Sequence, residues 1–373
     1  MIKTIGLRGF KCFNERKDIP LKQVTILYGK NGRGKSTVSQ SLLLLAQSMR
    51  RYNSLNRLVI NDGYVNQGFF EELISQDSSS KSFEVYLEPE AGESVAVVFE
   101  PIDKYPQYGA LVSQRLNGKE TFEAMSGSGD GTGSVQESDA FYSGVTSDTA
   151  ILQGLKDTIY VSADRNGPVN DVQNDYQQGE VPLNPYGQNI INVIAEQGPG
   201  FWDELKSHLS FILSGASLSI HFLPDRIALR LNSSNGGETM RPINVGFGYS
   251  YVLPVIVAAM LAKPKSLVII ENPEAHLHSG AQSRLANFLI TQAVRRDFQL
   301  ILETHSDHVI NGLRISAKNK AINPSDTIIL HFSHADDTVT PDIEEIKCDK
   351  NGNLSSFPDD FMDEWTKQLL ELV

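Results

Sequence analysis

The 373-residue sequence contains only two cysteines, Cys12 and Cys348, which lie far apart along the chain. So few cysteines exclude a disulfide framework and are typical of proteins from a reducing compartment. The sequence also has no apolar run near the roughly 20 residues that a membrane-spanning helix needs, and its N-terminus lacks the apolar segment of a signal peptide. We therefore expect a cytoplasmic protein that makes no contact with a membrane.

Basic residues are fewer than acidic ones: the chain has 33 Lys and Arg against 45 Asp and Glu, and its net charge is −12. A protein whose whole surface follows nucleic acid is usually basic. The charge therefore disfavours an autonomous DNA-binding protein. It confines any DNA contact to a local patch, to a nucleotide-bound dimer or to a partner protein.

The clearest motif is the stretch 28–37, Y-G-K-N-G-R-G-K-S-T, which fits the pattern G-x-x-x-x-G-K-[ST]. A short apolar run of β-forming residues precedes it, and a helical pattern follows it. This context is what a phosphate-binding loop requires, because its backbone N–H groups and the helix N-terminus attract phosphate oxygens. We therefore predict a nucleotide-binding P-loop. The residues expected to contact the nucleotide are Gly29, Lys30, Asn31, Gly32, Arg33, Gly34, Lys35, Ser36 and Thr37.

Two further strand patterns indicate the rest of a nucleotide site. Within the P-loop, Lys35 is expected to reach the β- and γ-phosphates and Ser36 to ligate Mg²⁺. The buried strand pattern 266–271 ends in Glu271, in the manner of a Walker B carboxylate, and we expect Glu271 to hold the Mg²⁺. The strand pattern 298–306 ends in E-T-H-S and would bring polar side chains to the same edge of the sheet.

The order of the patterns predicts an α/β fold in three parts. Residues 1–155 form an N-terminal lobe with the P-loop and an antiparallel β subdomain, in which the Gly-, Ser- and Asp-rich segment 125–148 is a flexible loop. Residues 156–245 form a helical and β insertion. Residues 246–373 form a C-terminal lobe whose alternating helices and strands indicate a parallel sheet. We predict a mixed or parallel core sheet and no long coiled coil.

The motifs and their order resemble the ABC-type ATPases of the SMC, RecF and OLD group. The resemblance is carried by the P-loop, by G-F-G-Y-S at 246–250, by E-N-P-E-A-H-L-H at 271–278 and by E-T-H-S at 303–306. Three other segments look like the small bacterial ATPases of defence loci, such as the Septu ATPase PtuA. They are G-F-K-C-F at 9–13, V-S-A-D-R-N-G-P at 161–168 and F-P-D-D-F-M-D-E at 357–364. The resemblance is weak between about 70 and 155.

In such ATPases two heads close around two ATP molecules, so the resemblance implies a homodimer through an ATP sandwich, or a larger oligomer built on it. Gly246, Gly248 and Ser250 would contact the γ-phosphate held by the opposite chain, where a helix N-terminus supplies N–H groups. His305 stands at the position of the switch histidine that senses the γ-phosphate. His278 would line the dimer interface.

The sequence departs from the ABC pattern at the end of the Walker B strand. Most ABC ATPases have Asp-Glu there, and the Glu polarises the attacking water, whereas this chain has Glu271-Asn272. Because asparagine cannot accept a proton, Asn272 can only orient water. Either Glu274 or Glu303 acts as the base, or hydrolysis is slow. Gln67 lies at the approximate position of the Q-loop residue that contacts Mg²⁺.

These observations predict an ATP-hydrolysing head that dimerises on ATP and regulates a separate effector protein, above all a nuclease, in antiphage defence. The defence role comes from the resemblance alone. Two alternatives stay open: a RecF- or SMC-like repair ATPase that acts on DNA directly, and a scaffold that binds ATP without hydrolysing it. The absence of long heptad runs argues against long-range tethering of DNA.

Overall fold

The computed structural model of the chain describes residues 1–123, 149–173, 182–233, 237–334 and 340–372. The segment 125–148, which the sequence predicts to be a flexible loop, lies outside the described residues.

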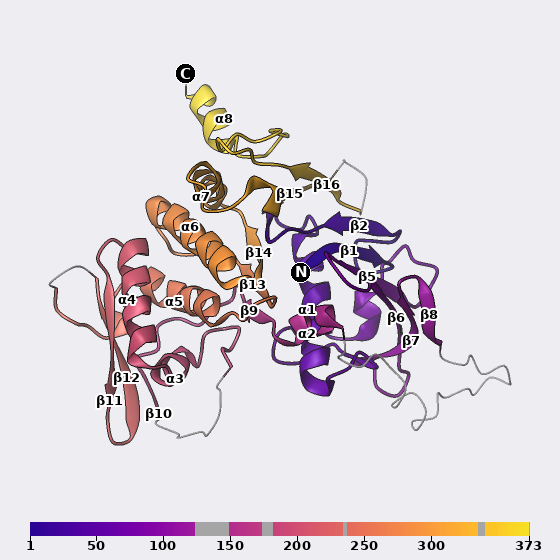
Figure 1. The fold of residues 1–373 in the computed structure, drawn as a ribbon, viewed down its shortest axis with the longest axis horizontal. Helices are drawn as coiled ribbons and strands as arrows, with labels where there is room; N and C mark the ends of the chain where they lie inside the picture. The colour runs from indigo at the N-terminus through magenta and orange to yellow at the C-terminus, as the bar shows by residue number, and fades with distance from the viewer. Residues whose placement is uncertain (124–148, 174–181, 234–236, 335–339, 373) are drawn as a thin grey trace.

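A six-stranded sheet runs through the middle of the molecule in the order β16-β15-β3-β14-β13-β9 (Figure 1). Neighbouring strands are parallel, except that β16 is antiparallel to β15. The strands are β3 (Val24–Gly29), β9 (Ile159–Val161), β13 (Leu267–Glu271), β14 (Gln299–Thr304), β15 (Thr327–Ser333) and β16 (Asp342–Ile346). The predicted core sheet is therefore confirmed.

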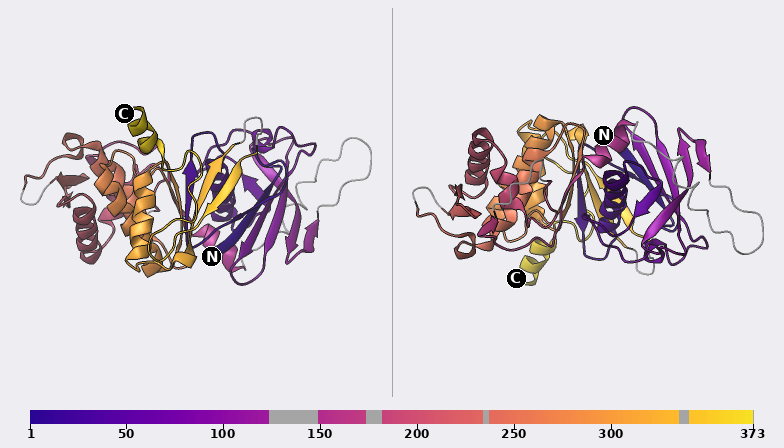
Figure 2. Two further views of the ribbon diagram at one scale, coloured as in Figure 1. Left: turned by 90° about the horizontal axis from the view of Figure 1, so that it is seen from above. Right: turned by 90° about the horizontal axis from the view of Figure 1, so that it is seen from below.

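Both faces of this sheet are covered, which explains why its strands read as continuous apolar runs. Successive side chains point to opposite faces, so Ile26 packs into one core cluster and Leu27 into the other. Seen from above and below, the sheet separates a helical layer from the antiparallel sheet (Figure 2). The helices are α1 (Lys35–Tyr52) and α2 (Ala150–Lys156) on one side, and α5 (Phe247–Leu261), α6 (Ser279–Arg296) and α7 (Asp307–Lys318) on the other.

The second sheet is antiparallel and has the order β2-β1-β5-β6-β7-β4, with β8 paired to β7. It packs over α1, and the expected antiparallel β subdomain is thus present. Its strands are β1 (Ile2–Arg8), β2 (Lys17–Pro20), β4 (Arg57–Val59), β5 (Phe83–Pro89), β6 (Val95–Pro101), β7 (Tyr108–Leu116) and β8 (Lys119–Glu123), and a short 3₁₀ helix, η1 (Phe70–Leu73), lies beside β6.

The insertion between the lobes contains two helices and a small sheet of order β10-β12-β11. The strands β11 and β12 are antiparallel and form a hairpin over 217–232. The elements are β10 (Asp171–Gln173), α3 (Ile190–Ala195), α4 (Pro199–Ile212), β11 (Ser217–Phe222), β12 (Arg226–Asn232) and η2 (Pro242–Asn244). A short 3₁₀ helix, η3 (Pro324–Asp326), precedes β15, and α8 (Glu364–Glu371) follows β16 near the C-terminus.

The central sheet joins all three predicted parts of the chain, because β3, β9 and β13 come from one part each. The division at residues 155 and 245 stays a prediction about the organisation of the sequence. No coiled coil is found in the described ranges, and none of their helices is long and apolar enough to cross a membrane. Cys12 and Cys348 are both free.

Candidate functional site

The P-loop connects the end of β3 to the start of α1. Gly34 precedes the helix with a φ of 88°, a left-handed conformation that favours glycine, and no side chain caps the first turn. The N–H groups of that turn are therefore free of a capping side chain and point into the loop. The Nζ of Lys35 donates hydrogen bonds to the carbonyl oxygens of Gly29, at 2.8 Å, and Lys30, at 2.7 Å. Burial lowers the pKa of Lys35.

The partner of the P-loop hydroxyl is a carboxylate on the adjacent strand. The Oγ of Ser36 donates a hydrogen bond of 2.6 Å to Oε1 of Glu303, the penultimate residue of β14. Because β14 lies between β3 and β13, Glu303 is paired in register with Leu27 on one side and Glu271 on the other. Burial, together with the nearby charge of Glu271, raises the pKa of Glu303 to about 7.

A cavity of about 260 Å³ opens beside this hydrogen bond, lined by residues 31–37, Lys11, Cys12 and Glu303. The second carboxylate oxygen of Glu303, Oε2, is buried without a hydrogen-bond partner. An orphaned carboxylate oxygen next to a P-loop serine fits a divalent cation, which prefers oxygen ligands. Among the described residues no group of three or more His, Cys, Asp or Glu side chains is arranged to hold a metal ion. A cation here would thus depend on phosphate oxygens as well.

The Walker B strand ends one strand further from the P-loop. Oε2 of Glu271 accepts a hydrogen bond from the backbone N–H of Ala163 at 3.3 Å, and burial raises the pKa of Glu271. Asn272 follows with a φ of 44°, and its N–H donates to the carbonyl of Glu303 at 2.7 Å. The structure therefore brings Glu271 and Asn272 to the same edge as the P-loop, but the carboxylate that touches Ser36 is Glu303.

A buried arginine, Arg165, holds the end of the Walker B strand. Its side chain is only 3% exposed and donates hydrogen bonds to the carbonyls of Ser162 and Glu271, both at 2.8 Å, and of Asn272, at 2.7 Å. Burial lowers the pKa of Arg165 to about 10. The guanidinium thus fixes the backbone from which Glu271 and Asn272 project, a role that the sequence pattern did not assign.

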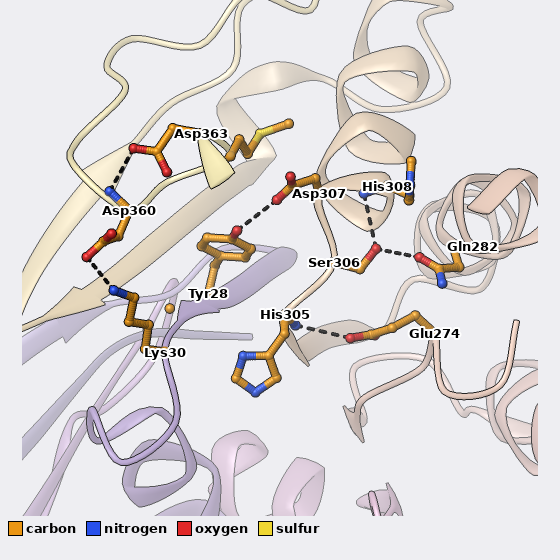
Figure 3. A pocket seen from close by; sticks show the side chains of 12 residues that line it. Tyr28, Lys30, Glu274, Gln282, His305, Ser306, Asp307, His308, Asp360 and Asp363 are labelled. Carbon is orange, nitrogen blue, oxygen red and sulfur yellow. Dashed lines mark hydrogen bonds and ion pairs between the residues drawn. The ribbon is translucent and has the colours of Figure 1, made fainter. Parts of the chain in front are cut away.

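A larger cavity of about 670 Å³ lies on the other side of the P-loop (Figure 3). It contains Glu274 and His305, whose backbone N–H donates to Oε1 of Glu274 at 3.1 Å. Burial and the nearby charge of Lys35 lower the pKa of His305, which favours a neutral ring. On the opposite wall the hydroxyl of Tyr28 donates to Oδ1 of Asp307 at 2.8 Å.

The C-terminal segment forms one wall of this larger cavity. Phe361 is 1% exposed and packs edge-on against Tyr28 and His331, with ring centroids 5.0 and 5.5 Å away. Its neighbour Asp360 forms a 2.8 Å salt bridge with Lys30 of the P-loop (Figure 3). The end of the chain is therefore connected directly to the nucleotide-binding loop.

The predicted signature residues lie in a third cavity, of about 510 Å³, away from the P-loop of the same chain. Gly246 and Gly248 line it and Ser250 follows in the first turn of α5. Gly248 is needed for close packing, since a Cβ there would lie 2.6 Å from the carbonyl oxygen of His276. This placement is compatible with contact to a nucleotide on another chain, and that contact stays a prediction.

Gln67 is not among the residues that line the P-loop cavity. Its side chain accepts a hydrogen bond from Lys11, which does line that cavity and also donates to Gln40 of α1. Lys11 was overlooked as a candidate, although it belongs to the G-F-K-C-F segment that carries part of the resemblance. Arg165 was overlooked in the same way within V-S-A-D-R-N-G-P.

Comparison with solved structures defines the class of fold. A crystal structure of an SMC head bound to the C-terminal winged-helix domain of ScpA is 14% identical, with a TM-score of 0.52 over 93% of this chain and 97% of that one. The SMC head of Pyrococcus furiosus bound to the C-terminal domain of ScpA is 12% identical, with a TM-score of 0.53 over 100% and 99% of the chains. The SMC head of Pyrococcus yayanosii is 12% identical, with a TM-score of 0.51 over 100% of this chain and 99% of that one. The chain has the fold of an SMC-type ATPase head.

The family is defined by the sequence itself. Residues 24–311 match the family described as "AAA domain, putative AbiEii toxin, Type IV TA system", and the chain belongs to that family. Residues 322–372, which include the segment that contacts the P-loop, match a second family model, "Protein of unknown function (DUF3696)". A search of curated proteins gave no significant match. Family and fold together identify an ATPase-type nucleotide-binding protein.

Proposed function

We propose that this protein is an ATP-dependent switch. Two copies close around two ATP molecules, slow hydrolysis reopens them, and the ATP-bound state controls a separate effector protein in antiphage defence. The observation that carries the ATPase part is the hydrogen bond between Ser36 and Glu303, with Lys35 beside it. It places a hydroxyl, an ammonium group and a buried carboxylate on one small cavity.

Each of these groups has a role in binding Mg·ATP. Lys35 is held by backbone carbonyls of its own loop, and exchanging them for phosphate oxygens replaces neutral acceptors by charged ones. Ser36 would provide a ligand to Mg²⁺, and Glu271 and Glu303 would face it from neighbouring strands. When bound, Mg²⁺ would neutralise part of the phosphate charge.

Slow turnover follows from the residue at position 272. Asn272 has no group that accepts a proton, so another residue must take it from the attacking water. The candidates are Glu303, which carries the raised pKa, and Glu274, which is bonded to the N–H of His305. Neither stands directly after the Walker B carboxylate, where most ABC ATPases have their Glu. Hydrolysis is therefore slow, and a long-lived ATP state suits a switch.

The effector part is supported by resemblance and by the neighbours. The chain resembles small ATPases of defence loci, its family carries the name of a toxin, and two similar SMC heads were solved with ScpA bound. We infer that this head likewise acts through a partner protein, most simply a nuclease. The net charge of −12 disfavours the competing proposal of a repair ATPase that acts on DNA directly.

Two measurements test the proposal. ATP turnover by the purified chain should exceed that of a Lys35→Ala variant, and equal rates would leave only an ATP-bound scaffold. An affinity purification from the native host should use Glu271→Gln to hold the ATP state and Lys35→Ala as the control. A nuclease or toxin recovered with the first variant and not with the second supports the switch. Recovery of repair proteins, or of DNA without a partner, contradicts it.

A further inference from the structure

The two larger cavities are both lined by the loop 272–278 and the start of α6. Glu274 and Gln282 line the 670 Å³ cavity, which we call the acidic cavity. His276 and Arg284 line the 510 Å³ cavity, which we call the signature cavity. A single short stretch of chain therefore contributes to both cavities. A two-fold axis through this stretch would set each cavity opposite the other cavity of a second copy, as an isologous interface requires.

The charges of the two cavities are opposite. The acidic cavity is lined by four carboxylates and one lysine, namely Glu274, Asp307, Asp360, Asp363 and Lys30. The signature cavity is lined by Arg284 and by no carboxylate. Complementary charge of this kind in neighbouring cavities of one chain favours association of like copies.

Both cavities contain charges that form no salt bridge in the described part of the chain: Glu274 and Asp307 in the acidic cavity, where Glu274 accepts only the backbone N–H of His305, and Arg284 in the signature cavity. Asp360 and Asp363 are paired with Lys30 and Lys367. Asp307, in contrast, accepts a hydrogen bond from the neutral hydroxyl of Tyr28 and forms no salt bridge in the described part of the chain.

The cation of the signature cavity, Arg284, likewise forms no salt bridge in the described part of the chain. Arg284 is held by the carbonyl of Ile212 and the hydroxyl of Ser214, both at 3.0 Å, and has no carboxylate within 4 Å among the described residues. Its guanidinium is thus oriented in advance and unpaired.

The apolar surface around the signature turn also favours a protein–protein interface. Phe247 lines the signature cavity and is 57% exposed, and Ile243 just before it is 63% exposed. Exposed aromatic side chains next to an arginine are typical of the centre of a protein interface. Opposite them, the acidic cavity offers the ring of Tyr28 and the side chain of Met362.

We propose that the occupant of the acidic cavity is the signature cavity rim of a second copy, and that Asp307 of one chain pairs with Arg284 of the other. This inference rests on the proposed closure of two copies on ATP and specifies the contacts that hold it. It also assigns a structural role to the C-terminal segment. Phe361 anchors the segment, so that Asp360, Met362 and Asp363 form the outer wall of the receiving surface.

The pairing should depend on ATP. The acidic cavity is lined by Gly29 and Lys30 of the P-loop and by His305, which follows β14. A bound triphosphate adds negative charge next to a cavity in which four carboxylates already outnumber one lysine. A cation from a second copy is then more strongly favoured than in the nucleotide-free chain.

The test is a charge exchange, measured by sedimentation velocity of the full chain with Mg²⁺ and a saturating concentration of a non-hydrolysable ATP analogue. Asp307→Arg and Arg284→Asp should each raise the dimer dissociation constant about tenfold or more, and the double variant should return it to within about threefold of the parent. Restoration by the double variant shows that the single variants still fold. Asp203→Arg, at an exposed carboxylate of α4 outside both cavities, is the matched control and should leave the constant unchanged.

Two other outcomes overturn the inference, and they can be told apart. If the parent dimerises with the analogue and the single reversals change nothing, or the double variant fails to recover, the pairing is wrong and the switch proposal stands. If the parent stays monomeric with Mg²⁺ and the saturating analogue, both proposals fall.

Discussion

The hydroxyl of Ser36 and the carboxylate of Glu303 are 2.6 Å apart, although 267 positions separate them in the sequence. This contact joins the P-loop to the strand that lies between it and the Walker B strand. Glu303 is 6% exposed and has a buried oxygen without a partner, so the contact is a buried polar network that is only partly satisfied. Such networks are costly without their ligand and are frequent at functional sites.

We predict that Glu303→Gln lowers the turnover number for ATP by about tenfold to a hundredfold. The amide keeps the size of the side chain and can still accept a hydrogen bond from Ser36, but it neither attracts Mg²⁺ as strongly nor takes up a proton. The measurement is steady-state phosphate release at saturating ATP. Glu88→Gln, at a partly exposed residue of β5 paired with Lys3, serves as control. Unchanged turnover in Glu303→Gln would show that the contact is structural.

The pKa of Glu303 predicts a pH-dependent stability in the absence of Mg²⁺ and ATP. It is raised to about 7, against 4.5 normally, so the folded state keeps its proton over a range in which the unfolded state has lost it. Stability from this group is complete below about pH 4.5 and is lost as the pH rises towards 7, by up to about 3 kcal/mol. Urea unfolding with EDTA present, between pH 5 and 8, should show the parent losing stability relative to Glu303→Gln. Parallel curves would contradict the prediction.

The P-loop could be predicted from the sequence because everything that defines it is local. A strand pattern, a glycine-rich loop and a helix follow each other within 24–52, and α1 begins at Lys35 as the motif requires. The parallel sheet could be predicted for a similar reason, since helices and strands alternate from 247 to 333.

The contact between Ser36 and Glu303 could not be predicted in this way. It depends on β14 inserting between β3 and β13 and on a register that pairs Glu303 with Leu27. Periodicity gives the existence of a strand but neither its place in the sheet nor its register. Arg165 was missed for a related reason, because only the fold shows that its guanidinium reaches three carbonyl groups.

Lys35→Ala should weaken ATP binding by about tenfold to a hundredfold, because a charge-assisted hydrogen bond to phosphate is lost. The change also removes the donor to the carbonyls of Gly29, in a buried contact, and of Lys30, so the unfolding transition of the variant is measured alongside its affinity. Isothermal titration with a non-hydrolysable ATP analogue measures the affinity, and Lys206→Ala, which breaks an exposed salt bridge to Asp203 on α4, is the control. Equal affinities in the two variants would contradict the assigned role of Lys35.

Arg165→Met should lower the free energy of unfolding by roughly 2–4 kcal/mol. Methionine fills much of the volume but leaves the carbonyls of Ser162, Glu271 and Asn272 without their donors. Urea unfolding provides the value. Arg226→Met, at an exposed arginine of β12, should leave the free energy of unfolding nearly unchanged. A small effect at Arg165 would mean that water replaces the guanidinium.

The residue after Glu271 offers a direct way to ask what limits hydrolysis. Asn272 has a φ of 44°, a left-handed conformation that asparagine tolerates better than glutamate does. Asn272→Glu should therefore cost about 1 kcal/mol of stability while supplying a carboxylate at the position where most ABC ATPases carry their water-polarising Glu. We expect ATP turnover to rise about tenfold. Asn272→Gln carries the same backbone cost and a side chain of the same length without a proton acceptor, so the difference between the two variants isolates the carboxylate. Equal turnover would show that proton transfer is already handled by Glu303 or Glu274 and that slow reopening of the dimer, rather than position 272, sets the rate.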